Sequence, residues 1–210
     1  MFIDLHTHHA THTPHTISII DCGTTPPTDS TPCSVGIHPW HIPPAWEHCM
    51  EQISRAAQAK NVVAIGECGI DKLNSPATPA LQTEILAAHA TLAEEAQKPL
   101  ILHCVKGQEE IIGLHRKMAA KQAWIIHGFR GKPTQAEQLL REGFFLSFGA
   151  LFNPRSLAIT PADRLFIESD TSSTPIEDIY KAAALCRGVS TEELAATIAS
   201  NIKLCNIAIF

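Results

Sequence analysis

The sequence predicts an α/β fold, a (β/α)8 TIM-type barrel that is reduced in its first βα units. Short apolar runs alternate with amphipathic stretches along the chain, which is typical of βα units. Eight of these runs have strand-like length, and several are continuously apolar, as expected for parallel strands covered on both faces. The length of 210 residues lies at the lower limit for such a barrel.

Strands are predicted where runs of aliphatic and aromatic residues end at a polar or turn-forming residue. In chain order they are Phe2–His6, Ile17–Ile20, Ser34–His38, Val62–Glu67, Pro99–His103, Ala123–His127, Phe144–Phe148 and Leu165–Asp170. Thr7–Thr16 and Thr24–Thr31 separate the first three strands and are predicted to be loops, because turn-forming and polar residues dominate them. These two loops are the reason to expect reduced first units.

Helices are predicted where apolar residues recur at helical spacing between the strands. In chain order they are Trp46–Lys60, Pro79–Gln97, Gln108–Lys121, Thr134–Glu142, Ile176–Arg187 and Thr191–Leu204. In the second helix, Leu81, Ile85 and Leu92 share one face. The last helix opens with Thr191-Glu-Glu-Leu194, which resembles a capped start.

An open, doubly wound sheet would produce the same alternation of strands and helices, and it stays open as the alternative architecture. The chain carries no Gly-rich dinucleotide-binding motif and no P-loop. No internal repeat or domain boundary is evident, so residues 1–210 are expected to form a single domain.

The composition is that of a globular protein, with 45% hydrophobic and 18% charged residues. A formal net charge of -5 argues against attraction to nucleic acid by long-range charge alone. No apolar run could span a membrane and no secretory signal pattern is present, so we expect a cytoplasmic protein without a membrane partner. Seven cysteines without a C-x-x-C pair argue against a disulfide framework.

Histidine is unusually abundant, with 12 residues. His6 and His8 are spaced by two, so on a strand both side chains point to the same face and could bind one metal ion. A His-rich surface loop explains this segment equally well when it is considered alone. We assign His9, His12 and His15 to such a loop, because no apolar run precedes them.

Four later strands end in a residue that can bind a metal, namely Glu67, His103, His127 and Asp170. Active sites of barrels form at the face where the C-terminal ends of the strands meet. Each of these residues could instead be a buried polar side chain satisfied by hydrogen bonds. Because four strands share this feature and the first strand adds a histidine pair, a separate structural explanation for each residue accounts poorly for the whole set. Imidazole and carboxylate are the ligands of zinc and similar divalent ions.

The chain also resembles the TatD-type metal-dependent hydrolases of the amidohydrolase superfamily. The matching segments, in the family order, are Phe2-Ile-Asp-Leu-His-Thr-His8, Ser34-Val-Gly-Ile-His-Pro39, Ile65-Gly-Glu-Cys-Gly-Ile-Asp71, Pro99-Leu-Ile-Leu-His103, Ile126-His-Gly-Phe-Arg-Gly131 and Ile167-Glu-Ser-Asp170. Gln82 and Asn201-Ile-Lys-Leu204 match a glutamine and a closing helix of the family. The opening segment also resembles histidinol-phosphatase-type phosphoesterases, but the later segments match the TatD type better.

The resemblance implies a site with two divalent metal ions, of zinc, manganese or magnesium. The implied ligands are His6, His8 and Asp170 at one ion, His103 and His127 at the other, and Glu67 between them. Asp170 would also take a proton from the attacking water, and His38 would lie at the substrate phosphate. The implied activity is hydrolysis of a phosphodiester, as in single-stranded DNA or short oligonucleotides.

Other interpretations stay open at this level. The same scaffold could hydrolyse a small amide, a lactone or a phosphate monoester. A metal-free binding protein is a third hypothesis, which the complete set of ligand types disfavours. The oligomeric state cannot be predicted from the sequence.

The substrate groove is where the chain departs from the family pattern. Val105 and Lys106 stand where the family usually has Arg-Asp, the chain is shorter than typical members, and the loop Thr171–Pro175 is short. The loops after the strands carry basic residues at Lys72, Lys106, Arg130, Lys132 and Arg155. These side chains either form a phosphate-binding rim or are ordinary solvated charges of surface loops.

Overall fold

The eight strands in the described part of the chain lie in one sheet, and every neighbouring pair is parallel. The computed structural model describes residues 1–9 and 15–209. The strands are β1 (Phe2–Thr7), β2 (Thr16–Asp21), β3 (Cys33–Val35), β4 (Val62–Asp71), β5 (Leu100–Val105), β6 (Trp124–Ile126), β7 (Phe145–Phe148) and β8 (Leu165–Ile167). Their order in the sheet is their order in the chain.

The last strand returns to the first, which closes the sheet. Thr7 pairs with Asp170, the next residue His8 donates its backbone N–H to Asp170 O at 3.2 Å, and Asp170 N–H is donated to His6 O at 2.9 Å. This contact, together with the sequential strand order, confirms the (β/α)8 barrel and excludes the open doubly wound sheet.

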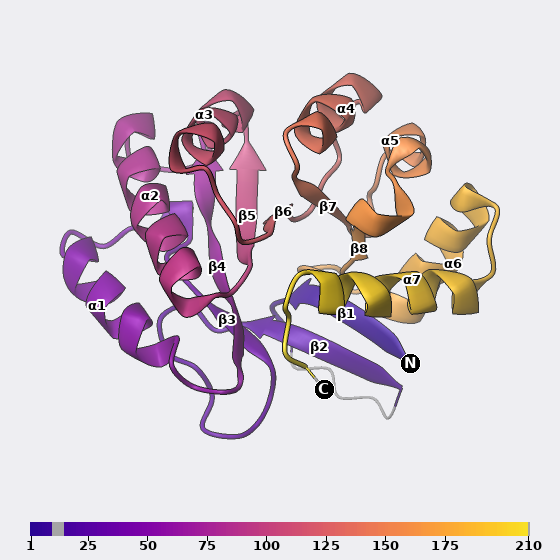
Figure 1. Ribbon diagram of the computed structural model, residues 1–210, viewed down its shortest axis with the longest axis horizontal. Helices are drawn as coiled ribbons and strands as arrows, with labels where there is room; N and C mark the ends of the chain where they lie inside the picture. The colour runs from indigo at the N-terminus through magenta and orange to yellow at the C-terminus, as the bar shows by residue number, and fades with distance from the viewer. Residues whose placement is uncertain (10–14, 210) are drawn as a thin grey trace.

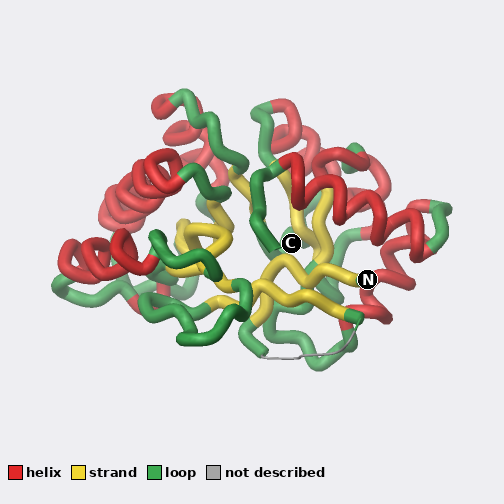
Figure 2. The backbone as a smooth tube through the Cα atoms, turned by 60° about the horizontal axis from the view of Figure 1, so that its bottom comes forward, coloured by secondary structure: helices red, strands yellow, loops and turns green. Residues whose placement is uncertain are grey.

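Helices cover most of the outside of the barrel (Figure 1). They are α1 (Trp46–Ala56), α2 (Pro79–Ala96), α3 (Gln108–Met118), α4 (Pro133–Arg141), α5 (Pro154–Ile159), α6 (Ile176–Arg187) and α7 (Thr191–Leu204), with short 3-10 helices η1 (Pro39–His41) and η2 (Ala162–Arg164). Among the described residues no helix lies between β1 and β3. Residues 22–32, between β2 and β3, form a loop as predicted (Figure 2), whereas the predicted loop Thr7–Thr16 lies largely outside the described residues.

Two strands near the site differ from their predicted lengths because of glycines. β3 ends at Val35 instead of His38, and a Cβ on the following Gly36 would lie 2.6 Å from Glu67 O. β4 continues past Glu67 through a register shift against β5. Gly69, with φ 139°, permits this, since a Cβ there would lie 2.1 Å from the backbone oxygen of His103.

Other strand ends differ from the prediction by one to three residues, as in β8, which ends at Ile167 instead of Asp170. Further differences concern the helices. α5 has six residues, and η1 and η2 have three each, too few for a helical period to be visible in the sequence. α1 ends at Ala56, four residues before the predicted end. The interior is continuous: all ten residues of β4 are buried, and large, fully buried side chains such as Trp124 and Tyr180 belong to the same hydrophobic core.

Candidate metal centre

Glu67 lies at the centre of a histidine cluster at the C-terminal ends of the strands. Its side chain is buried, with 2% exposure, and its two carboxylate oxygens face different imidazoles. The Oε2 atom lies 3.2 Å from His6 Nε2 and 3.5 Å from His8 Nε2. Both of these histidines come from the end of β1, where alternate residues share a face.

The other oxygen of Glu67 faces the histidines of β5, β6 and the segment after β3. Its Oε1 atom lies 2.9 Å from His103 Nδ1, 2.7 Å from His127 Nε2 and 3.0 Å from His38 Nε2. One carboxylate therefore divides five imidazoles into two groups.

Asp170 completes the first group from the end of β8. Its Oδ1 atom lies 3.6 Å from His8 Nε2. The residue adopts a left-handed backbone conformation with φ 54°, which is uncommon outside glycine and concentrates at functional sites. The same backbone hydrogen bonds that close the barrel hold it there, so the carboxylate is positioned by the sheet itself.

Asp71 orients His103 from behind. His103 Nε2 lies 3.1 Å from Asp71 Oδ2, while the other ring nitrogen faces Glu67. Burial alone would raise the pKa of Asp71, but hydrogen bonds from Trp40 Nε1 (2.6 Å) and from two backbone amides lower that pKa below its ordinary range. An anionic Asp71 accepts the Nε2 proton, which leaves the Nδ1 lone pair of His103 available for a metal ion.

Glu168 orients His127 in the same way. His127 Nδ1 lies 3.3 Å from Glu168 Oε1, and Gly128 N–H is donated to the same oxygen at 2.5 Å. Burial would raise the pKa of Glu168, but the hydrogen bond and the charge of His127 lower it. His127 Nε2, which faces Glu67, is therefore the nitrogen that can coordinate a metal.

His38 differs from these two histidines in the position of its proton. Its Nδ1 atom accepts the backbone N–H of Trp40 at 3.0 Å. The proton of the neutral ring must then be on Nε2, the nitrogen that faces Glu67. A protonated nitrogen has no lone pair for a metal, so His38 presents a hydrogen-bond donor to the site.

Three further side chains hold the strand ends in place. Asp4 accepts hydrogen bonds from Ser169 N at 2.8 Å and from Ser169 Oγ at 2.6 Å, which ties β1 to the segment after β8. Gln82 brackets Asp71, accepting its backbone N–H at 2.7 Å and donating to its carbonyl at 3.2 Å. Asn201 donates to two carbonyl oxygens at the start of β8.

His89, fully buried in α2, supports the segment that carries His38. Its Nε2 atom accepts Ile37 N–H at 3.0 Å, and its Nδ1–H is donated to Ile85 O at 2.8 Å. Burial lowers the pKa of His89 to about 4. The ring is therefore neutral at pH 7, as the accepting role of Nε2 requires.

The cluster fits a divalent metal ion. Ligand atoms lie within 4.8 Å of one another in three overlapping groups, His6–His8–Glu67, His6–His127–Asp170 and His38–Glu67–His103. Both ring nitrogens of His6 and the Oε2 atom of Glu67 are buried and have no hydrogen-bond partner among the described residues. Buried polar atoms without partners are costly, and a cation coordinated by imidazole and carboxylate would satisfy them.

The electrostatics of the cluster also favour a cation. Burial would raise the pKa of Glu67, but the charge of His127 and the close contacts with His103, His127 and His38 hold that pKa well below its usual value. Burial would lower the pKa of His127, but Glu67 and Glu168 hold it well above its usual value. Positive charge at the centre of the site therefore stabilises its buried carboxylates.

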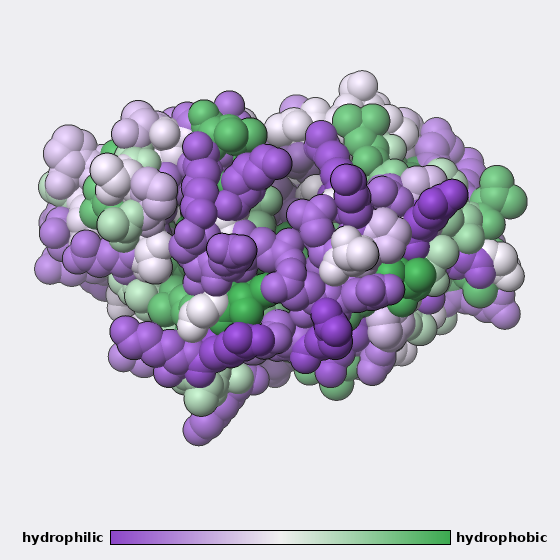
Figure 3. All heavy atoms as spheres, turned by 90° about the horizontal axis from the view of Figure 1, so that it is seen from above, coloured by the Kyte–Doolittle hydropathy of each residue, from purple (hydrophilic) through white to green (hydrophobic). Residues whose placement is uncertain are grey.

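The surroundings of the cluster include a pocket and exposed basic residues. The pocket, of about 210 Å³, lies beside Asp170 between the loops after β6, β7 and β8. Lys72 is paired with Glu110 at 2.5 Å. Four of the predicted rim residues are exposed and form no salt bridge within the part of the chain that the structure describes: Lys106, Arg130, Lys132 and Arg155. Figure 3, seen from the side toward which β5 points, shows a largely hydrophilic surface with separate apolar patches.

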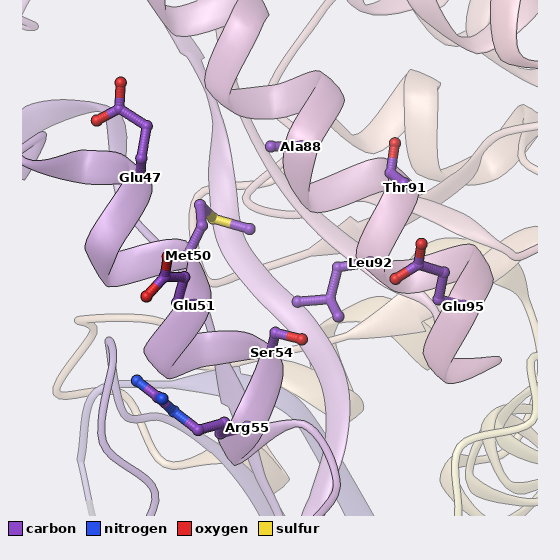
Figure 4. Close-up of a pocket in the computed structure, with 9 residues that line it drawn as sticks. All are labelled: Glu47, Met50, Glu51, Ser54, Arg55, Ala88, Thr91, Leu92 and Glu95. Atoms are coloured by element: carbon purple, nitrogen blue, oxygen red, sulfur yellow. The ribbon is translucent and has the colours of Figure 1, made fainter.

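A second groove, of about 570 Å³, lies on the outside of the barrel between α1 and α2 (Figure 4). Its labelled side chains include Glu51, Arg55 and Glu95, and none belongs to the histidine cluster. In the described residues no helix is both long and apolar enough for a transmembrane segment.

Comparison with known proteins identifies the family. The family described as TatD related DNase matches residues 27–205. The chain belongs to this family. It is 29% identical over 196 residues to the 3'-5' ssDNA/RNA exonuclease TatD of Erwinia tasmaniensis, covering 81% of this chain and 76% of that protein. It is 26% identical over 194 residues to the uncharacterized metal-dependent hydrolase YcfH of Escherichia coli K12, covering 82% and 72%.

Solved structures of TatD proteins share the fold. The crystal structure of YJJV, a TatD homolog from Escherichia coli K12, superposes with a TM-score of 0.83 at 19% identity and covers 98% of this chain and 97% of that one. A TatD family hydrolase from Entamoeba histolytica gives 0.75 at 16% identity with the same coverage. Family membership confirms the prediction of a metal-dependent hydrolase of the TatD type.

The structure brings together the side chains singled out in the sequence, namely His6, His8, His38, Glu67, His103, His127 and Asp170. His9 and His15 are exposed, and His12 lies outside the described residues. Asp71, Glu168 and His89 were not predicted from the sequence to have a role in the site. Asp71 and Glu168 lie in segments that resemble the family at strand ends, and this position could have indicated their role. His89 lies in a helix, where nothing in the sequence distinguishes it.

Proposed function

We propose that the chain hydrolyses phosphodiester bonds of short single-stranded nucleic acids with two divalent ions bridged by Glu67. The observation that supports this is the division of the histidines between the two oxygens of Glu67. We assign His6, His8 and Asp170 to one ion and His103 and His127 to the other. Zinc, manganese and magnesium are the candidate ions.

When bound, two such ions polarise a phosphoryl oxygen and supply an activated water at neutral pH. Asp170 is half-buried at the edge of the cluster, where it can accept the proton of the attacking water. His38 donates its Nε2–H to a phosphate oxygen and stabilises the charge that develops there. The Erwinia relative is named for action on single-stranded DNA and RNA, which supports a nucleic-acid substrate.

Metal analysis combined with an activity assay tests the proposal. The purified protein is expected to hold about two divalent ions per chain. Chelation should abolish hydrolysis of a dinucleotide, and Zn²⁺, Mn²⁺ or Mg²⁺ should restore it. A protein that binds no metal and is not activated by any of these ions would contradict the proposal.

A substrate panel separates the alternatives on the same scaffold. Phosphodiesters, phosphate monoesters, amides and lactones should be compared at equal metal loading. Preference for the phosphodiester supports the proposal, whereas exclusive action on a monoester, amide or lactone would replace it with a small-molecule hydrolase.

A further inference from the structure

Trp40 is an exposed aromatic side chain fixed at the edge of the histidine cluster. It lies in η1, which residues 36–38 separate from the end of β3, and keeps 43% of its surface exposed. Its ring centroid lies 4.9 Å from that of His38 and 5.7 Å from that of His103. The indole is therefore an exposed aromatic surface in direct reach of the cluster.

The indole is held in one orientation. Its Nε1–H is donated to Asp71 Oδ2 at 2.6 Å, and the backbone N–H of Trp40 is donated to His38 Nδ1 at 3.0 Å. Asp71 thus fixes the indole of Trp40 next to His103.

We infer that Trp40 binds the nucleobase adjoining the scissile phosphate; this inference rests on the proposed function. Bases stack on aromatic side chains, and the interaction tolerates any base because each has a π face. A base is joined to its phosphate through a single sugar, and the indole lies against His38 and His103, the two histidines beside which that phosphate is proposed to bind. A fixed ring is also a platform that loses little conformational entropy on binding.

A purely structural role for Trp40 makes a different prediction. If the indole only satisfied Asp71, its loss would act through Asp71 on His103, and metal binding would suffer with every ligand. If the indole binds a base, its loss would weaken only ligands that carry one. Ligands with and without a base therefore separate the two roles.

The experiment measures equilibrium binding to the metal-loaded protein, without turnover. The probes are deoxyadenosine monophosphate and deoxyribose phosphate, which differ only by the base. Wild type should bind the nucleotide more tightly, and Trp40→Leu should weaken nucleotide binding about tenfold while leaving deoxyribose phosphate affinity and metal content unchanged. Trp40→Phe should recover most of the difference, because phenylalanine retains the ring but lacks the indole N–H. Leu185→Ser, at an exposed position of α6, is the control.

Equal binding of both probes by wild type, or equal weakening of both by Trp40→Leu, would overturn the inference. Loss of metal in Trp40→Leu together with weaker binding of both probes would assign Trp40 to support of Asp71 alone. Because no hydrolysis is measured, discrimination between the probes supports the base site even if the phosphodiesterase assay fails. Conversely, if the protein hydrolyses a dinucleotide but binds the two probes equally, only the base site is refuted.

Discussion

His103 and Asp71 are joined by a contact of 3.1 Å that decides which imidazole nitrogen faces Glu67. Because Asp71 accepts the Nε2 proton, Nδ1 points into the cluster with its lone pair free. Carboxylates behind metal-binding histidines fix both the tautomer and the ring orientation, and they increase ligand basicity. Asp71 thus supports the proposed metal centre through His103, although its own side chain does not face Glu67.

Asp71→Asn is expected to weaken metal binding at the His103 side and activity by about 10- to 100-fold. The amide cannot provide the same anionic acceptor for both Trp40 and His103. Metal titration of the variant against wild type measures the effect. Asp178→Asn, at an exposed residue of α6 paired with Lys181, is the matched control. Unchanged affinity for both ions in Asp71→Asn would refute this role.

The strand ends were predictable from the sequence because they obey a simple geometric rule. Parallel strands in a barrel deliver their last residues to one face, so His103, His127 and Glu67 were expected to meet. The continuation of β4 to Asp71 was not predicted, since Gly69 follows soon after Glu67 and glycine weakens strands. In the structure the φ values of Gly66 and Gly69, 134° and 139°, allow β5 to approach closely.

Residues that act through another side chain could not be predicted from the sequence. Glu168 was noticed only as an acid near a strand end, and its contact with His127 depends on the register of β6 and β8 around the barrel. His89 lies in a helix, and its bond to Ile37 crosses 52 positions of sequence. Neither spacing nor hydropathy encodes such pairings, because tertiary packing creates them.

Glu67→Gln should remove at least one ion and nearly all activity while preserving the fold. An amide offers only one oxygen, so it cannot serve both ions in the way proposed for the carboxylate. Circular dichroism is expected to match wild type, and elemental analysis should show about one ion per chain or fewer. Normal turnover by this variant would show that the bridge is assigned incorrectly.

His38→Ala should separate substrate binding from metal binding. Because the Nε2 proton excludes coordination, metal content should stay at the wild-type value. Catalytic efficiency should fall by about 100-fold, the typical effect of losing one donor to a developing charge. His38→Gln can present an amide N–H and should recover part of the loss. If His38→Ala loses metal instead, His38 is a ligand.

His89 should make stability depend on pH. Its pKa is about 4 in the fold and 6.5 in the unfolded chain, so its contribution is complete above pH 6.5 and is lost as pH falls toward 4. Between pH 7.5 and 5 wild type should lose about 2 kcal/mol of unfolding free energy from this group. Urea unfolding of metal-free wild type and His89→Gln measures this contribution to the free energy of unfolding. The variant should be less stable than wild type at pH 7.5, and the difference between the two should shrink at acid pH. A difference independent of pH would contradict the assignment.

The loops around the site predict a preference for short substrates. The loop Thr171–Pro175 has only five residues before α6 begins, of which Thr171, Ser172 and Thr174 line the pocket at Asp170. Between β2 and β3 the chain forms a loop in place of a helix. The pairing of Lys72 with Glu110 removes one cation from the predicted rim. Lys106 keeps a charge but not the forked geometry of arginine. Fewer phosphate contacts mean less affinity gained along a strand and a shallow dependence on salt.

We therefore expect catalytic efficiency per cleavable end to be as high on a dinucleotide as on a single strand of about 20 nucleotides. The slope of log catalytic efficiency against log salt concentration should correspond to only a few neutralised phosphates. The comparison should be made at low and moderate salt with the same metal ion. Arg130→Gln tests the rim directly, because Arg130 borders the pocket beside Asp170. Its loss should affect both substrates alike, since each places a phosphate there. A strong preference for the long strand that salt steeply weakens would demonstrate an extended phosphate-binding groove, and the short loops would then not limit the substrate.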